Sequence, residues 1–322
     1  MDEKFNDEDI SPSLPMDNIN KFDETYSIEK EILNTDEFKL YIGKEKKTKN
    51  INKVIIKEYK EEFIKKLDNN DLFDFEKKIL NICNNKYVIK LDKINNCYQS
   101  KNKIIFVFEH FETTLRNEMK QKGKFKLDEI KYILFQINEA IKYLNQRNIN
   151  EVIISPDSIG INKKDNFYSI KLFNLFPYYK LKNNSQYIKS KFNSLLYLSP
   201  EMPTKFNKKN YLDIQKKEDL SDDKISKSLI RTINTTSYLW NIGVLIYELY
   251  FGEYPFKKDD FENDNEVVLN LKISESKDFD NLVSNLLIID KDKRLKWNDY
   301  INHKFFLTLE ADKVYQNLYE KK

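Results

Sequence analysis

The chain has 322 residues, of which 33% are charged and 40% hydrophobic, and its formal net charge is +3. This length can bury a substantial core in one large or two moderate domains. The balanced charge, without a long basic run, disfavours a dedicated nucleic-acid surface. The two cysteines, Cys83 and Cys97, are too few for a disulfide framework or a zinc site.

The first residues are polar and acidic, and they predict a flexible tail over 1–23. The opening sequence MDEKFNDEDI lacks the apolar centre of a secretory signal. No apolar run reaches the roughly 18 residues that a membrane span requires. We therefore expect an intracellular, cytoplasmic protein without a membrane span.

Short β-type runs dominate the next part of the chain. Three of them, at 26–33, 38–45 and 49–59, are separated by polar turns. Apolar residues at helical spacing follow over 61–85. Strand character returns at 87–94 and 103–111.

From residue 112 onward the pattern is mostly helical. Residues 127–148 predict a long amphipathic helix, and 237–252 are apolar nearly all round, which is typical of a buried central helix. Shorter helices are predicted at 281–290 and 297–306, with a helical tail over 307–322. A small β-rich lobe before a larger helical lobe is an α+β plan.

A charged segment over 202–236 lies between strong helical signals and predicts an insertion loop. One interpretation is a solvated loop without a function of its own. The other is a docking or modification site, since Ser221, Ser226 and Ser228 lie among charged residues.

The C-terminal half contains three motifs in sequence: YLSPE at 197–201, an apolar helix that ends in GEYPF over 239–256, and DKDKRLKWNDYINHKFF at 290–306. In this order they resemble three features of the eukaryotic protein kinase family. These are its Ala-Pro-Glu motif, its central helix with the following Gly-x-x-Pro-Phe, and its closing Arg and His-Pro-Phe-Phe pattern. The resemblance covers 24–306 and implies a bilobal fold, with an N-lobe over 24–111 and a C-lobe over 112–306. It also implies that Glu201 and Arg294 form the family's buried ion pair.

The N-lobe keeps the framework positions of the family. The resemblance places Lys57, in VIIK, at the ATP-gripping lysine and Glu76 at its helical partner. Phe108 stands at the gatekeeper position of the hinge. Lys57 and Glu76 could still clamp ATP, but we interpret them as a structural ion pair in a vestigial nucleotide site.

The stretch EVIISPDSIGI at 151–161 aligns with the family's catalytic loop but lacks its chemistry. Ile153 replaces the catalytic aspartate, and isoleucine cannot accept a proton. General-base assistance is typically worth about 10²–10⁴-fold, so this loss is severe. Ser155 replaces the lysine and Ser158 the metal-binding asparagine. Asn174 replaces the magnesium aspartate without its charge.

The nucleotide-binding positions have changed as well. Leu33, Thr35 and Phe38 take the three glycine positions of the phosphate loop, where close backbone approach favours residues without a Cβ. Ile55 replaces the small roof of the adenine slot, and Gly160 replaces its large apolar floor. We therefore expect no cofactor, although weak, metal-independent ATP binding stays open.

Two further positions bear on regulation. Val152 replaces the arginine that receives an activation-loop phosphate, so switching through phosphorylated Ser190 or Ser194 is not expected. Tyr238 replaces the aspartate that braces the catalytic loop. The sequence therefore predicts that the brace is lost together with the loop.

The sequence predicts a pseudokinase, a kinase-like protein that binds other proteins as a scaffold or allosteric regulator. Its expected partner is a protein, either an active kinase or a multi-protein assembly, and not a nucleic acid. One alternative is a serine/threonine-type kinase with a displaced acid, for which Glu151, Asp157 and Asp165 are the candidates. Another is a nucleotide-binding switch without phosphotransfer, using Lys57.

Overall fold

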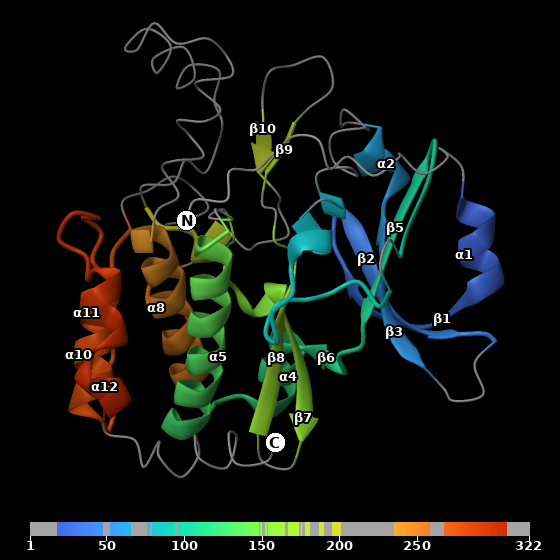
Figure 1. The fold of residues 1–322 in the computed structure, drawn as a ribbon. Coiled ribbons are helices and arrows are strands. Elements are labelled where there is room, and N and C mark those ends of the chain that lie inside the picture. The colour runs from blue at the N-terminus through green and yellow to red at the C-terminus, as the bar shows by residue number, and fades with distance from the viewer. Residues whose placement is uncertain are drawn as a thin grey trace, which may run out of the picture.

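The fold has a β-rich N-terminal part and a larger helical C-terminal part (Figure 1). The computed structural model describes residues 18–47, 52–65, 76–77, 79–93, 96–147, 149, 152, 154–164, 167–173, 175, 178–180, 187–189, 195–200, 235–257 and 267–307. The two parts meet where Val88 forms a parallel bridge with Leu172. The architecture is α+β, as the sequence predicts.

The N-terminal part is built on an antiparallel sheet with the strand order β1-β2-β3-β5-β4. Its strands are β1 (Tyr26–Asn34), β2 (Phe38–Glu45), β3 (Lys53–Tyr59), β4 (Cys97–Ser100) and β5 (Lys103–Glu109). The central strand β3 is covered on both faces, because side chains alternate along a strand. Ile55 joins the main core, whereas Val54 and Ile56 join a second apolar cluster on the opposite face.

A short helix, α1 (Ile19–Thr25), covers that second cluster, and it corrects the predicted flexible tail over 1–23. Phe22 is buried against Tyr98, with ring centroids 5.5 Å apart. The Asn18 side chain accepts a hydrogen bond from the backbone N–H of Gln99 at 2.8 Å. The tail prediction is therefore wrong for residues 18–23, because an apolar sheet face needs a cover; residues 1–17 lie outside the described residues.

The segment after β3 is described in part. Within 61–85 the structure describes residues 61–65, 76–77 and 79–85, and α2 (Glu61–Ile64) and residues 76–77 and 79–82 among them are helical, as the apolar spacing predicts. The predicted strand over 87–94 is wrong. Val88 and Leu91 make only isolated bridges, and the fourth strand forms at 97–100. Residues 87–91 instead connect the two parts of the molecule, because Leu91 pairs with Phe108 while Val88 pairs with Leu172.

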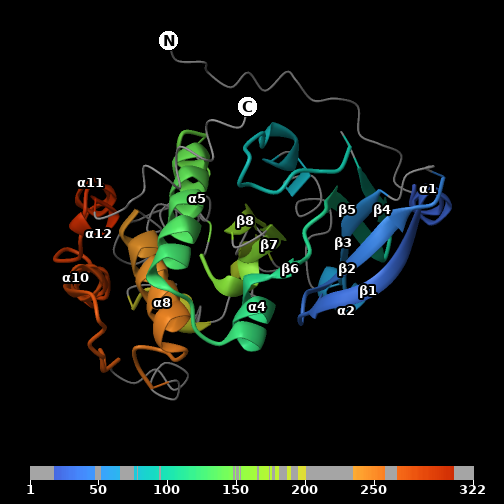
Figure 2. The ribbon, with the colours of Figure 1, turned by 90° about the horizontal axis from the view of Figure 1, so that it is seen from below.

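The C-terminal part is organised around α8 (Thr235–Phe251), which lies between α5 and α10 in Figure 2. The other helices are α4 (Leu115–Lys122), α5 (Leu127–Asn145), α10 (Lys277–Leu286), α11 (Trp297–Ile301) and α12 (Lys304–Leu307). The apolar face predicted for the long helix is confirmed, since Ile130, Ile133, Leu134, Ile137, Ile141 and Leu144 are all buried. Residues 202–234 and 308–322 lie outside the described residues.

A small sheet of β6 (Thr113–Thr114), β7 (Ile159–Lys164) and β8 (Phe167–Leu172) lies at the junction of the two parts. A separate pair is formed by β9 (Tyr178–Lys180) and β10 (Tyr187–Lys189). Two short 3-10 turns, η1 (Pro156–Ser158) and η2 (Leu195–Tyr197), complete the described elements. The turn η1 leads directly into β7. The small sheet therefore positions the stretch 151–161, which resembles the family's catalytic loop and is called the catalytic stretch below.

Candidate functional site

The two framework residues of the N-terminal part lie together in its core. Lys57 projects from β3, and its Nζ is 2.7 Å from Oε1 of Glu76 in the helical residues 76–77. The side chains are only 2% and 4% exposed, so the pair is shielded from water. A buried pair of this kind is costly to break, because the remaining charge has no compensation.

A third residue, Tyr59, joins this pair and was missed in the sequence. Lys57 Nζ donates to the Tyr59 hydroxyl at 2.6 Å, and that hydroxyl donates to Oε2 of Glu76 at 2.5 Å. Tyr59 follows Lys57 by two positions on β3, and residues two apart on a strand share a face. The two-residue spacing could have predicted this contact, because it places the Tyr59 phenol beside Lys57 on one face of the strand.

The turn between β1 and β2 places an aromatic ring on the same lysine. The Thr35 side chain closes the turn by accepting the backbone N–H of Phe38 at 2.9 Å. Phe38 is fully buried, and its ring centroid lies 4.7 Å from Lys57 Nζ. A cation over a ring face is attracted by the ring quadrupole. Phe38 thus fills space beside the ammonium group, at the position where the family has a glycine.

An aromatic pair lies at Gly160, the position that the resemblance gives to the floor of the adenine slot. Phe111 stacks on Phe173 with ring centroids 5.3 Å apart. A Cβ added to Gly160 would lie 2.5 Å from Cδ1 of Phe111, so the ring occupies the place of a floor side chain. Phe111, Phe173 and the roof residue Ile55 are each no more than 2% exposed. Phe111 was missed in the sequence, although an aromatic residue at the end of the hinge, with a glycine at the floor position, was a usable signal.

The described part of the catalytic stretch is buried and bonded to itself. Ser155 and Ser158 are fully buried; the Ser158 hydroxyl donates to the Ser155 carbonyl at 2.9 Å and accepts the Ser155 N–H at 3.1 Å. Val152 and Ile154 are buried in the main core. Ile153 and Asn174 lie outside the described residues, so their replacements stay predictions.

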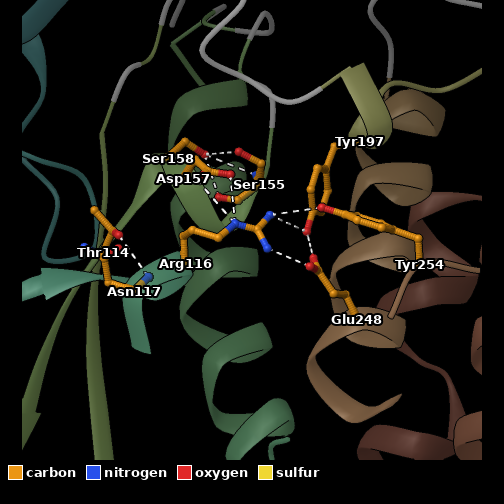
Figure 3. Close-up of polar contacts among 9 residues, drawn as sticks. All are labelled: Thr114, Arg116, Asn117, Ser155, Asp157, Ser158, Tyr197, Glu248 and Tyr254. Carbon is orange, nitrogen blue, oxygen red and sulfur yellow. Dashed lines mark hydrogen bonds and ion pairs between the residues drawn. The ribbon is translucent and has the colours of Figure 1, made fainter. Parts of the chain in front are cut away.

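Asp157 is the one candidate for a displaced catalytic acid that lies within the described residues. Its Oδ2 is 3.2 Å from Nε of Arg116 on α4, as Figure 3 shows. Arg116 also pairs with Glu248 of α8 through Nη1, at 2.6 Å. Burial alone lowers the pKa of Arg116, but the carboxylates of Asp157 and Glu248 outweigh it and raise that pKa. The Asp157 carboxylate is therefore engaged in an ion cluster.

A side chain of α8 holds the backbone of the catalytic stretch, although Tyr238 replaces the aspartate that the resemblance expects there. Tyr238 is buried, but Asn241, three residues further along α8, accepts a hydrogen bond from the backbone N–H of Ile154 at 3.3 Å. Residues three apart on a helix are neighbours on its surface. The prediction that the brace is lost is wrong, because an amide on the next turn reaches the same loop.

Arg294 occupies a buried position, while its predicted partner Glu201 lies outside the described residues. The Arg294 side chain donates to the carbonyls of Ile288 at 2.9 Å and Ile289 at 3.3 Å. Its guanidinium carbon lies 5.1 Å from the ring centroid of Trp240. The ion pair with Glu201 stays a prediction.

Metal-binding clusters and membrane-spanning helices were also sought among the described residues. Among the described residues, no cluster of three or more His, Cys, Asp or Glu side chains could hold a metal ion. Within the same part of the chain, none of the helices has the length and apolar character for crossing a membrane.

Comparison with known proteins gives a consistent set of relatives. No family model matches the chain. The chain is 24% identical over 268 residues to 3-phosphoinositide-dependent protein kinase B of Dictyostelium discoideum, which covers 80% of this chain and 25% of that protein. It is 26% identical over 185 residues to serine/threonine-protein kinase ULK3 of Xenopus laevis, covering 55% of this chain and 33% of that one. The chain thus spans about a quarter to a third of the length of these relatives.

A solved structure extends the comparison to three dimensions. The crystal structure of Rad53 1-466 in complex with AMP-PNP superposes with a TM-score of 0.59 at 18% sequence identity. The match covers 88% of this chain and 66% of that one. At this identity the likeness establishes the fold.

Proposed function

We propose that this chain, which has the protein-kinase fold and serine/threonine protein kinases among its relatives, is a pseudokinase that binds other proteins as a scaffold or allosteric regulator. One observation carries the proposal. The lysine that the family uses to hold ATP is enclosed by side chains of this chain itself, and its Nζ contacts Glu76, Tyr59 and the ring of Phe38.

The enclosure of Lys57 works against phosphate binding. An ammonium group has three N–H donors, and here Glu76 and the Tyr59 hydroxyl accept two of them. The ring faces of Phe38 and Tyr59 lie 4.7 and 4.5 Å from Nζ. A phosphate could reach Lys57 only if these rings moved, which would expose apolar surface that is now buried.

The adenine side supports the same proposal. Phe111 lies against Gly160 and stacks on Phe173, and Ile55 belongs to the same buried core. In a close-packed core a flat ligand would need an aromatic side chain to leave its place. This packing supports a kinase fold whose core extends into the position where the resemblance places the nucleotide.

A protein partner follows from what the fold retains. A chain that keeps a large kinase-like surface while filling its cleft is suited to contact other proteins rather than a small substrate. We propose an active kinase or a multi-protein assembly as the partner, and the cytoplasm as the location. We propose no cofactor, no metal and no nucleic-acid ligand.

A nucleotide-binding switch is the second candidate, because Lys57 and Glu76 are paired as ATP binding in the family requires. This alternative requires Phe38 and Phe111 to move aside together. Phosphotransfer with a displaced acid is less well supported. Asp157 is already paired with Arg116, and the acids at 151 and 165 lie outside the described residues.

The decisive experiment is a thermal-shift titration of the purified chain with ATP, in magnesium and again in EDTA. A ligand that binds only the native state raises the melting temperature. We expect no shift in either buffer, while an active kinase measured in parallel does shift. Lys57→Met is the matched variant, compared with its own melting temperature without ATP.

Each other outcome selects a different function. A magnesium-independent shift that is absent in Lys57→Met would replace the scaffold proposal with the nucleotide switch. A shift that requires magnesium would contradict the proposed loss of metal binding, and phosphotransfer to a generic substrate would then be measured.

A further inference from the structure

Two buried polar residues of the central helix α8, Asn241 and Glu248, lie among buried apolar neighbours. Asn241 and Glu248 are 3% and 7% exposed, whereas Leu239, Ile242 and Val244 are fully buried apolar neighbours. These two polar residues, called anchors below, are seven residues apart, which is close to two helical turns and places them on one face about 10 Å apart. A buried polar group persists only where it is hydrogen-bonded, so their partners define what the helix holds.

The first anchor, Asn241, uses both ends of its side-chain amide. Its Oδ1 accepts the backbone N–H of Ile154 at 3.3 Å, at the start of the catalytic stretch. Its Nδ2 donates to the backbone carbonyl of Tyr197 in η2. One amide therefore ties two separate loops to the same helix.

The second anchor, Glu248, holds the Tyr197 loop directly and the Asp157 loop through Arg116 (Figure 3). The Tyr197 hydroxyl donates to Oε2 of Glu248, while Arg116 Nη1 donates to Oε1 at 2.6 Å. Arg116 Nη2 donates to the hydroxyls of Tyr197 at 3.1 Å and Tyr254 at 3.4 Å, and Nε donates to Asp157 at 3.2 Å. All three guanidinium nitrogens are in use.

The contacts form a closed circuit from α8 through η2 and α4 to η1. Tyr197 is held twice, by its carbonyl and by its hydroxyl. Asp157 and Glu248 would repel each other if the guanidinium between them were absent. An arginine suits this place because its rigid fork can bond several acceptors at fixed angles and stays charged.

We propose that the Arg116 side chain takes the place that a bound ligand could have between these loops. Together with Asn241 it locks residues 154–158 and 195–198 onto α8. The lock needs no nucleotide, no metal and no phosphate, because every group in it belongs to the chain. This fits Val152, which offers no cation to a phosphorylated loop. The proposal does not depend on whether the chain transfers phosphate, since none of these contacts involves the nucleotide cleft.

The test is amide hydrogen exchange on the full chain with Arg116→Ala. We expect exchange over 154–158 and 195–198 to become at least about tenfold faster, while β3 and β5 change less than about twofold. Millimolar ethylguanidinium should restore most of the protection, because it can refill the place of the guanidinium. The matched control is Arg147→Ala, since Arg147 lies over the ring of Tyr143 at the end of α5, outside the circuit. It should leave both loops unchanged.

Asn241→Leu is a second variant that keeps the proposal testable if Arg116→Ala fails to fold. Leucine has nearly the same volume and brings no charge, but it loses both the acceptor for the Ile154 N–H and the donor to the Tyr197 carbonyl. We expect faster exchange over 154–155 and 195–198, with β3 and β5 changed less. Unchanged exchange in both variants would overturn the proposal, as would loop protection that disappears after phosphatase treatment of the unmutated chain.

Discussion

In the β-rich part, the lysine and glutamate that the resemblance pairs are both present, whereas in the helical part the stretch that resembles the catalytic loop carries other residues. Lys57 and Glu76 keep their pairing, yet Tyr59 and Phe38 enclose the lysine. The stretch around Ser155 has a different composition, yet its backbone is held by Asn241. A retained motif residue is thus no proof of retained function, and a replaced one is no proof of lost shape.

The difference has a physical reason. A buried ion pair is hard to remove one partner at a time, because the remaining charge would be uncompensated. Burial of both Lys57 and Glu76 therefore gives a reason for keeping the pair that does not depend on nucleotide binding. A loop can keep its shape with any hydrogen-bonding partner that reaches its backbone, so its residues can change more freely.

The largest expected effect comes from removing the buried ring of Phe111 beside Gly160. Phe111→Ala removes a ring that is 1% exposed and stacked on Phe173, so we expect the free energy of unfolding to fall by about 3–5 kcal/mol. Urea unfolding measures this loss. A dry apolar cavity can bind a small aromatic molecule, so indole should raise the melting temperature of this variant and not of the unmutated chain.

The matched control for that prediction is Phe167→Ala. Phe167 is 47% exposed and contacts Tyr132 edge-on, so the loss should be about 1 kcal/mol or less. Equal losses in the two variants would contradict the assignment of Phe111 as a core residue that fills the slot.

A smaller effect is expected where the lysine is enclosed. Tyr59→Phe removes the hydroxyl that links Lys57 to Glu76, and both charged groups then lose a buried hydrogen bond. We expect the free energy of unfolding to fall by about 1–3 kcal/mol. Tyr250→Phe, a partly buried tyrosine of α8, is the control and should change stability by less than about 0.5 kcal/mol. A loss in the control as large as in Tyr59→Phe would mean that the hydroxyl does not support the ion pair.

The sequence predicted much of the fold because the relevant signals are periodic. The apolar face of 127–148 and the three strands between residues 26 and 59 follow from the spacing of apolar residues alone. The strand over 87–94 was misplaced because its apolar residues serve contacts between the two parts rather than a ladder. Helix α1 was missed because its short apolar stripe makes sense only against the sheet face that it covers.

The residues of the candidate site were predictable only where a single position matches a family motif. Lys57 and Glu76 could be placed from the resemblance, and the structure brings them into contact. The position of Phe111 could not be predicted, because no motif marks it. Its ring lies in the space that is free only because residue 160 is a glycine. Asn241 was hidden in a helix that reads as apolar throughout, and only its contact with Ile154 reveals its role.

The smallest expected effect uses the two histidines of the chain, one in each part of the molecule. Burial lowers the pKa of His110, next to Phe111, and also that of His303, between α11 and α12. The folded-state pKa therefore lies below the unfolded value of about 6.5. As the pH falls below that value, the unfolded chain binds more protons, so the free energy of unfolding decreases.

Each histidine thus gives a probe of its own region. His110→Gln and His303→Gln should each flatten part of the fall in stability between pH 7 and pH 5, and the double variant should flatten the sum of both. Urea unfolding of the four proteins across this range measures the slopes, and acidic groups cancel in the differences. Additive contributions would mean that the filled cleft and the helical core respond to protonation independently. Identical slopes in all four proteins would contradict the lowered pKa values that partial burial gives both imidazoles.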